Sequence, residues 1–246
     1  MQLEIIAHRG FSAISPENTL AAFFAAIQHQ ANSIEFDVQL SSDKVPVIIH
    51  DATVDRTTDG IGKVKDKTLE QLKKLDAGAW FSSEFSGEKI PTLKEALRMA
   101  KDIEGGKFVQ QFIYAEVKES DDWSASDIDN FIQTIISEGW ENKCIVASFN
   151  HKFLWQLRNQ FPSITLGYLV NSIETYTQRL SMAANDGNAV MLSQYNILLN
   201  NPSLVQSSRS QGVDVVAWTV DSQEDLQRLA ELGVVRIVTN SLIDLN

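Results

Sequence analysis

The sequence predicts an α/β fold, a TIM-type (β/α)8 barrel with an insertion after the second strand. Apolar runs of strand length alternate with amphipathic stretches of helix length, which is typical of a parallel sheet covered by helices. Eight main strands are expected, and right-handed crossovers wind such units in one direction until the sheet closes. The length of 246 residues suits such a barrel. No Pro-rich or Gly-rich linker divides the chain, so we expect a single domain over 1–246.

The expected elements follow from the spacing of apolar residues. The main strands are expected over 3–8, 33–39, 110–118, 144–148, 164–169, 188–192, 214–219 and 235–239. Helices are expected over 17–30, 92–102, 125–138, 150–160, 172–185, 202–211 and 222–232. Because only a short segment follows the last strand, the eighth helix is expected to be missing or vestigial.

Residues 51–91 are too many for a simple loop between a strand and a helix. They follow a short apolar strand expected over 46–49, and they contain several glycines and one short helix expected over 68–74. We therefore interpret 51–91 as an insertion within the barrel domain. It is expected on the face where the strands end.

The composition limits the partners and the location. The chain carries 32 acidic and 21 basic residues, a formal charge of −11, which argues against binding to a nucleic-acid backbone. No signal peptide and no apolar run long enough to cross a membrane is recognised, so no stable membrane insertion is expected. The lone Cys144 cannot form an intramolecular disulfide, which is compatible with a reducing compartment. We expect a cytoplasmic protein and leave its oligomeric state open.

Three carboxylates are expected at one edge of the sheet. Glu35 and Asp37 are two residues apart on the second strand, so their side chains share a face, and Glu116 follows on the next strand. The alternative for such a pattern is an antiparallel strand with one solvated face. In a helix-covered parallel sheet, carboxylates on the inward face need a cation. All-oxygen ligands suit Mg²⁺ or Ca²⁺ better than Zn²⁺.

Histidines and cations lie close to these carboxylates in the predicted fold. His8 ends the first strand and His50 the short strand after the second, so together they could act as general base and general acid. Arg9 and Lys118 are either phosphate ligands or counter-ions of the acids. A divalent cation, two imidazoles and two cationic side chains suit a displacement at phosphorus in an anionic substrate. The chain has no GxxxxGK[ST] or GxGxxG motif that would favour a nucleotide.

These motifs, in this order, resemble the glycerophosphodiester phosphodiesterase family. The resemblance covers nearly the whole chain and is dense over 5–97. The matching segments are Ala7–Gly10 (AHRG), Ser15–Thr19 (SPENT), Ile34–Val38 (IEFDV), Pro46–Asp51 (PVIIHD), Asp55–Gly60 (DRTTDG), Asp76–Phe81 (DAGAWF), Ile90–Ala96 (IPTLKEA) and Ala217–Val220 (AWTV).

The resemblance implies a role for each of eight residues. They comprise three ligands of one divalent cation, an acid–base pair, two phosphate ligands and an aromatic residue of the substrate pocket: Glu35, Asp37 and Glu116; His8 and His50; Arg9 and Lys118; and Trp218. The alternative for the aromatic residue is a plain barrel-core position. Glu17 and Asn18 are expected to cap the first helix and to orient Arg9.

The sequence departs from the family pattern at two places. The last strand ends in Thr239-Asn240, where the family often has Thr-Asp, so a carboxylate is missing near the rim. Tyr114-Ala115 stands before the third metal acid, where small or amide residues are common. Neither departure touches the three metal ligands, the two histidines or the two phosphate ligands.

The resemblance implies metal-dependent hydrolysis of glycerophosphodiesters to glycerol 3-phosphate and an alcohol. Either water or a neighbouring hydroxyl of the substrate would attack the phosphorus. One alternative is a phospholipase-D-like activity on lysophospholipids, for which Trp80, Phe81 and Phe85 are possible walls of an acyl channel, if they do not form the core of the insertion. Another is a non-catalytic barrel that binds a phosphate ligand.

Overall fold

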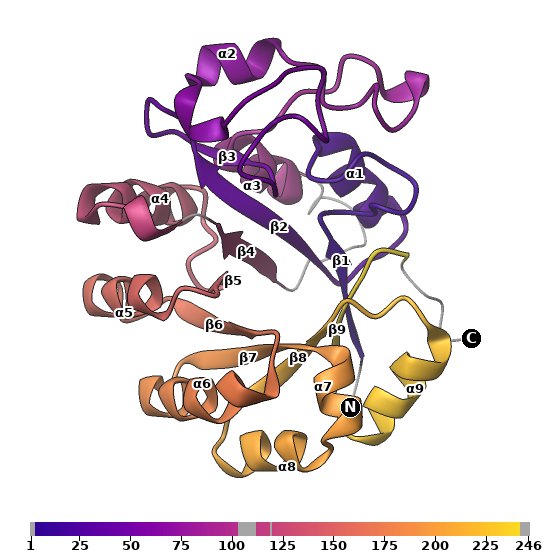
Figure 1. Ribbon diagram of the computed structural model, residues 1–246, viewed down its shortest axis with the longest axis vertical. Helices are drawn as coiled ribbons and strands as arrows, with labels where there is room; N and C mark the ends of the chain where they lie inside the picture. The colour runs from indigo at the N-terminus through magenta and orange to yellow at the C-terminus, as the bar shows by residue number, and fades with distance from the viewer. Residues whose placement is uncertain (1–2, 103–111, 119, 242–246) are drawn as a thin grey trace.

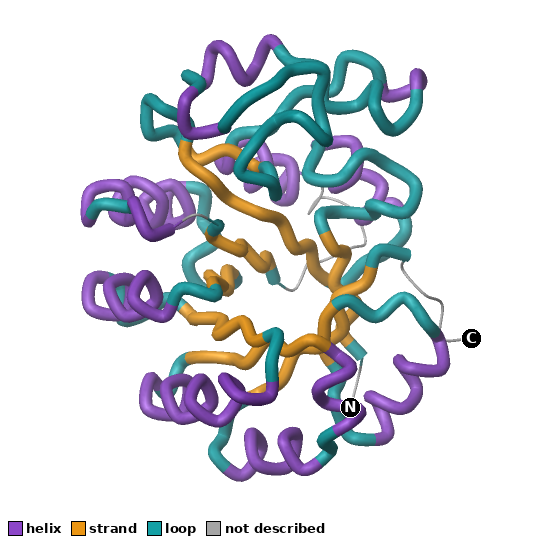
Figure 2. Tube along the Cα trace, in the orientation of Figure 1, coloured by secondary structure: helices purple, strands orange, loops and turns teal. Residues whose placement is uncertain are grey.

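The computed structural model describes residues 3–102, 112–118 and 120–241 and forms a closed barrel (Figures 1 and 2). Eight described strands pair in parallel in the order β1-β2-β4-β5-β6-β7-β8-β9, and β9 pairs with β1. They are β1 Glu4–His8, β2 Ser33–Leu40, β4 Ile113–Val117, β5 Cys144–Ser148, β6 Thr165–Val170, β7 Ala189–Gln194, β8 Asp214–Trp218 and β9 Arg236–Thr239. The predicted fold class is confirmed.

Helices surround this ring on its outside (Figure 1). They are α1 Leu20–Gln28, α3 Leu93–Asp102, α4 Ala125–Ser137, α5 His151–Gln160, α6 Ile173–Asp186, α7 Tyr195–Asn200, α8 Ser203–Ser210 and α9 Gln223–Glu231. The short α7 was not predicted, because six residues carry too little periodicity to be recognised. None of the helices in the described ranges is both long and apolar enough to cross a membrane.

Alternate residues of the strands point to opposite faces of the sheet and contribute to two separate apolar cores. On β2, Ile34, Phe36 and Val38 are buried between the sheet and the helices. The barrel interior is filled by a second cluster: Ile6, Tyr114, Ile145, Ala147, Leu169, Val190, Leu192, Val216 and Val238. Gly167 makes room there, because a Cβ at this position would lie 2.7 Å from a methyl group of Leu192. The barrel interior is therefore a packed apolar core and not an open channel.

The insertion packs over the end of β2, at the top of Figure 1. The strand β3 Pro46–Ile48 pairs antiparallel with β2 and is followed by the 3-10 turn Val64–Asp66, the helix α2 Leu69–Lys74 and the 3-10 turn Ser83–Phe85. Its apolar residues Val54, Val64, Leu72, Ala77 and Ile90 form one core with Val47 and Ile49 from β3 and its end.

The aromatic residues of the insertion lie elsewhere than expected. Phe81 contacts both Trp80 and Phe85 edge to face, and all three lie outside the aliphatic cluster that forms the core of the insertion. They are also absent from the lining of the barrel-mouth pocket. The structure therefore supports neither expectation for them, as channel walls or as core, because aliphatic residues form the core of the insertion and other residues line the pocket.

One predicted helix boundary differs from the structure, and two predictions fall partly on residues that the structure does not describe. The helix expected over 17–30 begins only at Leu20, because the Thr19 side chain accepts from the Ala22 N–H and caps it. Residues 110 and 111 of the third predicted strand lie outside the described residues. The same holds for 242–246, on which the prediction about an eighth helix depends.

Candidate active site

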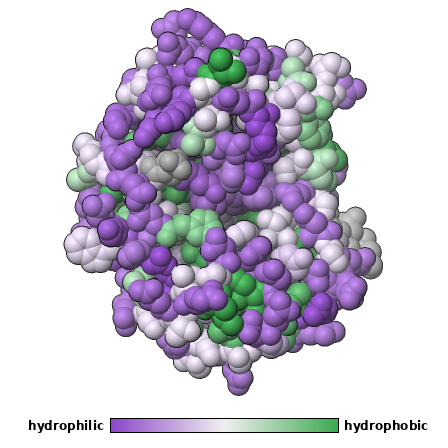
Figure 3. All heavy atoms as spheres, viewed as in Figure 1, coloured by the Kyte–Doolittle hydropathy of each residue, from purple (hydrophilic) through white to green (hydrophobic). Residues whose placement is uncertain are grey.

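A pocket of about 280 Å³ opens at the carboxyl ends of the barrel strands. Seven of the eight predicted site residues line it, and the eighth, Asp37, is buried beside it with 1% of its surface exposed. On the face seen in Figure 3, hydrophilic side chains gather above the centre and a hydrophobic patch lies below it. The structure thus brings together residues from both ends of the sequence.

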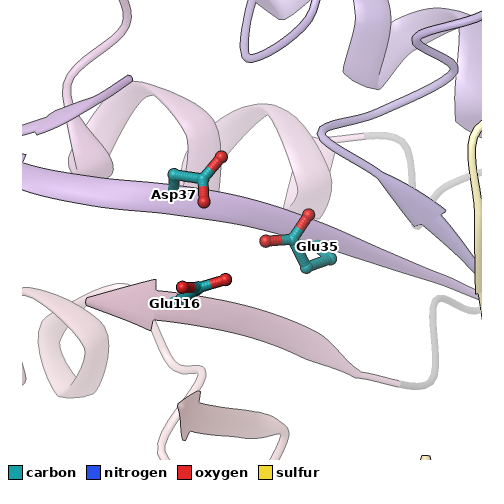
Figure 4. Close-up of side chains that lie close together, drawn as sticks. All are labelled: Glu35, Asp37 and Glu116. Atoms are coloured by element: carbon teal, nitrogen blue, oxygen red, sulfur yellow. The ribbon is translucent and has the colours of Figure 1, made fainter. Parts of the chain in front are cut away.

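Three carboxylates converge at one side of this pocket. Glu35 and Asp37 project from β2 and Glu116 from the neighbouring β4, where it pairs with Asp37 in the strand register. Figure 4 shows the three carboxyl groups turned toward one another. One oxygen from each lies within 4.8 Å of the others. Within the described residues, Glu35 Oε1 and Asp37 Oδ1 are buried without a hydrogen-bond partner, so this donor set fits a divalent cation.

The three carboxyl groups shift one another's pKa because their negative charges repel. Burial, together with the nearby charge of Asp37, raises the pKa of Glu35 well above its ordinary value and that of Glu116 to about 7. Burial acts on Asp37 as well, but the charges of Arg9 and Lys118 outweigh it and lower the pKa of Asp37. Asp37 therefore keeps its charge, while its two neighbours resist ionisation.

The turn after β1 places Arg9 against these acids. Arg9 has a left-handed backbone (φ 57°), and Gly10 continues the turn with φ 80°. The backbone N–H of Arg9 donates to Glu35 Oε2 at 2.9 Å, and its Nε lies 3.2 Å from Asp37 Oδ2. On the other side of the acids, Lys118 Nζ lies 3.3 Å from Asp37 Oδ1 and also contacts Glu116. Both cations thus contact the acids, as their role as counter-ions requires, and both also line the pocket.

Two imidazoles face the same pocket. His8 Nε2 lies 4.0 Å from Glu35 Oε2, and its Nδ1 lies 2.7 Å from Asn240 Oδ1. His50 Nδ1 lies 2.7 Å from Asp51 Oδ1. Burial, reinforced by the charge of Arg9, lowers the pKa of His8 to about 4. Each ring therefore has one nitrogen held by a polar partner, and the two histidines differ in whether that partner is charged.

Comparisons with known proteins agree with this geometry. The model of the glycerophosphoryl diester phosphodiesterase family matches residues 8–243. The chain belongs to this family. A glycerophosphodiester phosphodiesterase of Caldanaerobacter subterraneus subsp. tengcongensis is 38% identical over 242 residues, which cover 98% of this chain and 95% of the relative. A Bacillus subtilis glycerophosphodiester phosphodiesterase is 29% identical over 249 residues, covering 96% and 82%.

A solved structure shares the fold over nearly its whole length. It is a phosphodiesterase of Oleispira antarctica in complex with the product sn-glycerol-3-phosphate. The two structures superpose with a TM-score of 0.86 at 30% identity, covering 97% of this chain and 93% of the other. The protein is thus an enzyme of the phosphodiester hydrolase class.

Sequence reasoning missed an ion-pair network that joins the insertion to the barrel of this phosphodiesterase. Arg56 donates to both oxygens of Asp51 at 2.7 and 3.0 Å and to both oxygens of Glu17 at 2.8 Å. Glu17 also accepts from Arg9 Nη1 at 2.8 Å. Paired bonds of this kind fix both partners in orientation. The position of Asp51 next to His50 was a usable signal, whereas the partner of Arg56 could be found only in three dimensions.

The predicted role of Glu17 and Asn18 is correct in one part only. Glu17 orients Arg9, as expected. Asn18 donates instead to Asp37 Oδ2 at 2.8 Å, and the helix cap that was assigned to both is supplied by Thr19. Asn18 has a left-handed backbone (φ 57°), which turns its side chain toward the acids before the helix begins.

Apolar residues line the opposite side of the pocket. Trp218 contacts Phe149 edge to face, with ring centroids 6.0 Å apart, and Leu169 and Leu192 line the same pocket. Trp218 also packs against the barrel interior, so the pocket and core positions coincide. Its Nε1 is a buried donor with no hydrogen-bond partner among the described residues. Phe149 was missed by sequence reasoning, although its place directly after β5 was a signal.

Proposed function

We propose that this enzyme hydrolyses glycerophosphodiesters to glycerol 3-phosphate and an alcohol, with one divalent cation and histidine acid–base catalysis. The observation that carries the proposal is the pocket in which three carboxylates, two imidazoles and two cationic side chains converge. The Oleispira antarctica relative, solved with sn-glycerol-3-phosphate as product, supports the choice of substrate.

Glu35, Asp37 and Glu116 would hold the cation, which we take to be Mg²⁺ or Ca²⁺ from their oxygen ligands. The two buried carboxylate oxygens that lack hydrogen-bond partners among the described residues support this assignment. A bound cation would polarise a phosphoryl oxygen and neutralise charge that develops on it. Arg9 and Lys118, which line the same pocket, would bind the remaining phosphate oxygens, the former with a planar fork and the latter with a point charge.

The two histidines would carry the proton transfers. His8 accepts the proton of the attacking hydroxyl, which belongs to water or to the substrate's own glycerol. As the phosphorus–oxygen bond to the alcohol breaks, His50 donates a proton to the leaving oxygen. This assignment rests on the partners of the rings, because the Asp51 carboxylate stabilises a protonated imidazole better than the Asn240 amide does. Attack by water completes the hydrolysis with these two transfers, whereas attack by the glycerol hydroxyl gives a cyclic phosphate that water then opens with a second pair of transfers.

Trp218 and Phe149 would bound the space for the alcohol. The lysophospholipid alternative has lost the acyl-channel walls that were predicted for it, since those aromatics lie outside the pocket lining.

We further propose that residues 1–246 fold as one domain and that the enzyme is cytoplasmic. Fractionation of the source cell tests the location.

Phosphorus NMR of the products tests the function. The enzyme is incubated with a panel of glycerophosphodiesters and a lysophospholipid, with Mg²⁺, with Ca²⁺ and with excess chelator. We expect glycerol 3-phosphate from the glycerophosphodiesters, no turnover with chelator, and turnover lowered roughly 10²-fold or more in the variants His8→Ala and His50→Ala. Full activity in chelator would contradict the proposed cation, and full activity of either variant would contradict the role of that histidine.

A further inference from the structure

Asn240 lies between His8 and a carboxylate that the proposed reaction does not use. Its amide oxygen lies 2.7 Å from His8 Nδ1 and accepts from Ser12 Oγ at 3.0 Å. Its amide nitrogen donates to Asp221 Oδ2 at 2.6 Å. The backbone N–H of Asn240 and the hydroxyl of Thr239 donate to the other oxygen of Asp221, at 2.7 and 2.9 Å. Asp221 thus receives three hydrogen bonds from the end of β9.

These contacts fix which group donates and which accepts in each hydrogen bond from Asp221 through Asn240 to His8. An ionised carboxylate can only accept, so the side of the Asn240 amide that faces Asp221 must be the NH₂ group. The amide oxygen must then face His8. An amide oxygen can only accept as well, so His8 Nδ1 must carry a proton. In a neutral imidazole the other nitrogen, Nε2, is then free of a proton and acts as an acceptor.

We propose that Asp221, acting through Asn240, holds His8 in the tautomer that leaves Nε2 able to accept a proton. Asp221 and Asn240 are positioning residues, and the inference rests on the proposed role of His8 as the base. It gives a function to the place where the sequence departs from the family pattern, since an asparagine stands where the family often has an aspartate. Asp221 supplies a carboxylate on the far side of this amide from His8.

The substitution Asp221→Asn reverses this polarity without a change of shape. The backbone N–H of Asn240 is an obligatory donor, so it holds the amide oxygen of the introduced asparagine in the place of Oδ1. The introduced NH₂ group then faces the NH₂ group of Asn240. Rotation of the Asn240 amide by half a turn removes this clash of donors, and its NH₂ group then donates to His8 Nδ1. His8 must change to the tautomer with a proton on Nε2 and can no longer act as a base.

Nitrogen NMR of the imidazole rings measures this tautomer directly. The Mg²⁺-loaded enzyme is labelled with ¹⁵N-histidine, and the His8 signals are assigned by comparison with His8→Gln. In the wild-type enzyme at neutral pH we expect the unprotonated, downfield nitrogen to be Nε2. In Asp221→Asn we expect it to be Nδ1, with kcat lowered about 10²-fold or more and KM nearly unchanged.

The swapped pair Asp221→Asn with Asn240→Asp keeps every donor opposite an acceptor. In it we expect the wild-type tautomer and recovery of most of the lost turnover. Asp129→Asn, an exposed position on α4, is the control for loss of one negative charge and should change neither quantity. Wild-type His8 with its proton on Nε2, or a swapped pair that keeps the tautomer of Asp221→Asn, would overturn the proposal.

The same data separate this inference from the proposed function. If the tautomer follows Asp221 as expected while His8→Gln keeps full turnover, the positioning by Asp221 stands and the role of His8 as a base is wrong. If His8→Gln is inactive but Asp221→Asn keeps the wild-type tautomer, the proposed function stands and the positioning by Asp221 is wrong.

Discussion

At the scale of single residues, the two histidines are distinguished by what lies behind them. His50 is backed by the Asp51 carboxylate, which two bonds from Arg56 orient. His8 is held by the neutral amide of Asn240, and burial together with the charge of Arg9 lowers its pKa to about 4. A neutral imidazole suits a base, and an imidazole beside a carboxylate suits an acid.

The leaving group of the substrate tests this difference. A nitrophenyl phosphodiester releases an oxygen that needs little protonation, so His50→Ala should regain much of its lost turnover on this substrate. His8→Ala should stay roughly 10²-fold or more below wild type on both kinds of ester. Relative turnover on the nitrophenyl ester and on glycerophosphocholine is the measurement. If the ester rescues the His8 variant in place of the His50 variant, the two roles are exchanged.

Arg9 offers a second test at this scale. Arg9→Lys keeps the charge but removes the planar fork, so as a phosphate ligand it should lower kcat/KM by about tenfold or more. Arg98→Lys, at an exposed arginine that pairs with Glu138 on the outer helices, is the matched control and should be silent. An Arg9→Lys enzyme with wild-type kinetics would mean that Arg9 only balances the carboxylates.

At the scale of elements, the turn between β1 and α1 positions much of the site. Arg9, Gly10 and Asn18 all have positive φ there, a conformation that costs energy for residues with a side chain. At Gly10 a Cβ would lie 2.6 Å from the backbone of Ala22 in α1. The turn and the helix are therefore in direct contact, and their contact sets the position of Arg9.

Gly10→Ala should lower both stability and activity. Strain from the positive φ and the clash with α1 should together cost more than about 2 kcal/mol, which corresponds to a fall in Tm of roughly 4 °C or more for a chain of this size. Gly187→Ala at the end of α6 has a similar φ of 72° but nothing within 4 Å of the added Cβ. It therefore measures the loss of stability that comes from the positive φ alone. Calorimetry that finds equal losses in Tm for the two variants would contradict the clash.

At the scale of the whole molecule, the site lowers the stability of the metal-free protein. One oxygen each of Glu35, Asp37 and Glu116 lies within 4.8 Å of the others, so the negative charge of Asp37 opposes the ionisation of Glu35 and Glu116 when no cation is bound. A cation that binds only the native protein stabilises it by about 2.7 kcal/mol at 100 times its dissociation constant.

Addition of Mg²⁺ or Ca²⁺ to chelator-treated enzyme should therefore raise Tm by roughly 5–10 °C. In Glu116→Gln, which loses one like charge and one strong ligand, the metal-free protein should melt no lower than metal-free wild type. Its response to added cation should nearly vanish, and so should its activity. Differential scanning calorimetry with and without cation measures both shifts. A full metal-induced shift in Glu116→Gln would mean that the cation binds elsewhere.

The pKa of Glu116 sets a pH dependence for the same quantities. Burial and the charge of Asp37 raise this pKa from 4.5 to about 7 in the metal-free protein. Between these values the native state holds a proton that the unfolded chain has lost, so the free energy of unfolding should fall as pH rises. A cation competes with that proton, so its affinity should rise with pH up to about 7. Calorimetric titration with Mg²⁺ at about pH 6 and about pH 8 measures the change, and equal affinities would contradict it.

The patterns of the sequence predicted the barrel and seven of the eight candidate site residues, and the resemblance to the family added Trp218. The reason is physical: strand and helix periodicities are local, the carboxyl ends of parallel strands meet at one face, and residues two apart share a side. Glu35 and Asp37 could be assigned to the barrel interior for this reason, and Glu116 followed from the same phase on the next strand.

The groups that hold those residues in place became visible only in three dimensions. Arg56 reaches Glu17 across 39 residues, and His8 reaches Asn240 across 232. Partners so far apart leave no periodic signal, because nothing local fixes the distance between the loops that carry them. The core of the insertion was misjudged for a related reason: which of its apolar residues turn inward depends on loop geometry, and aliphatic residues filled the space assigned to Trp80, Phe81 and Phe85.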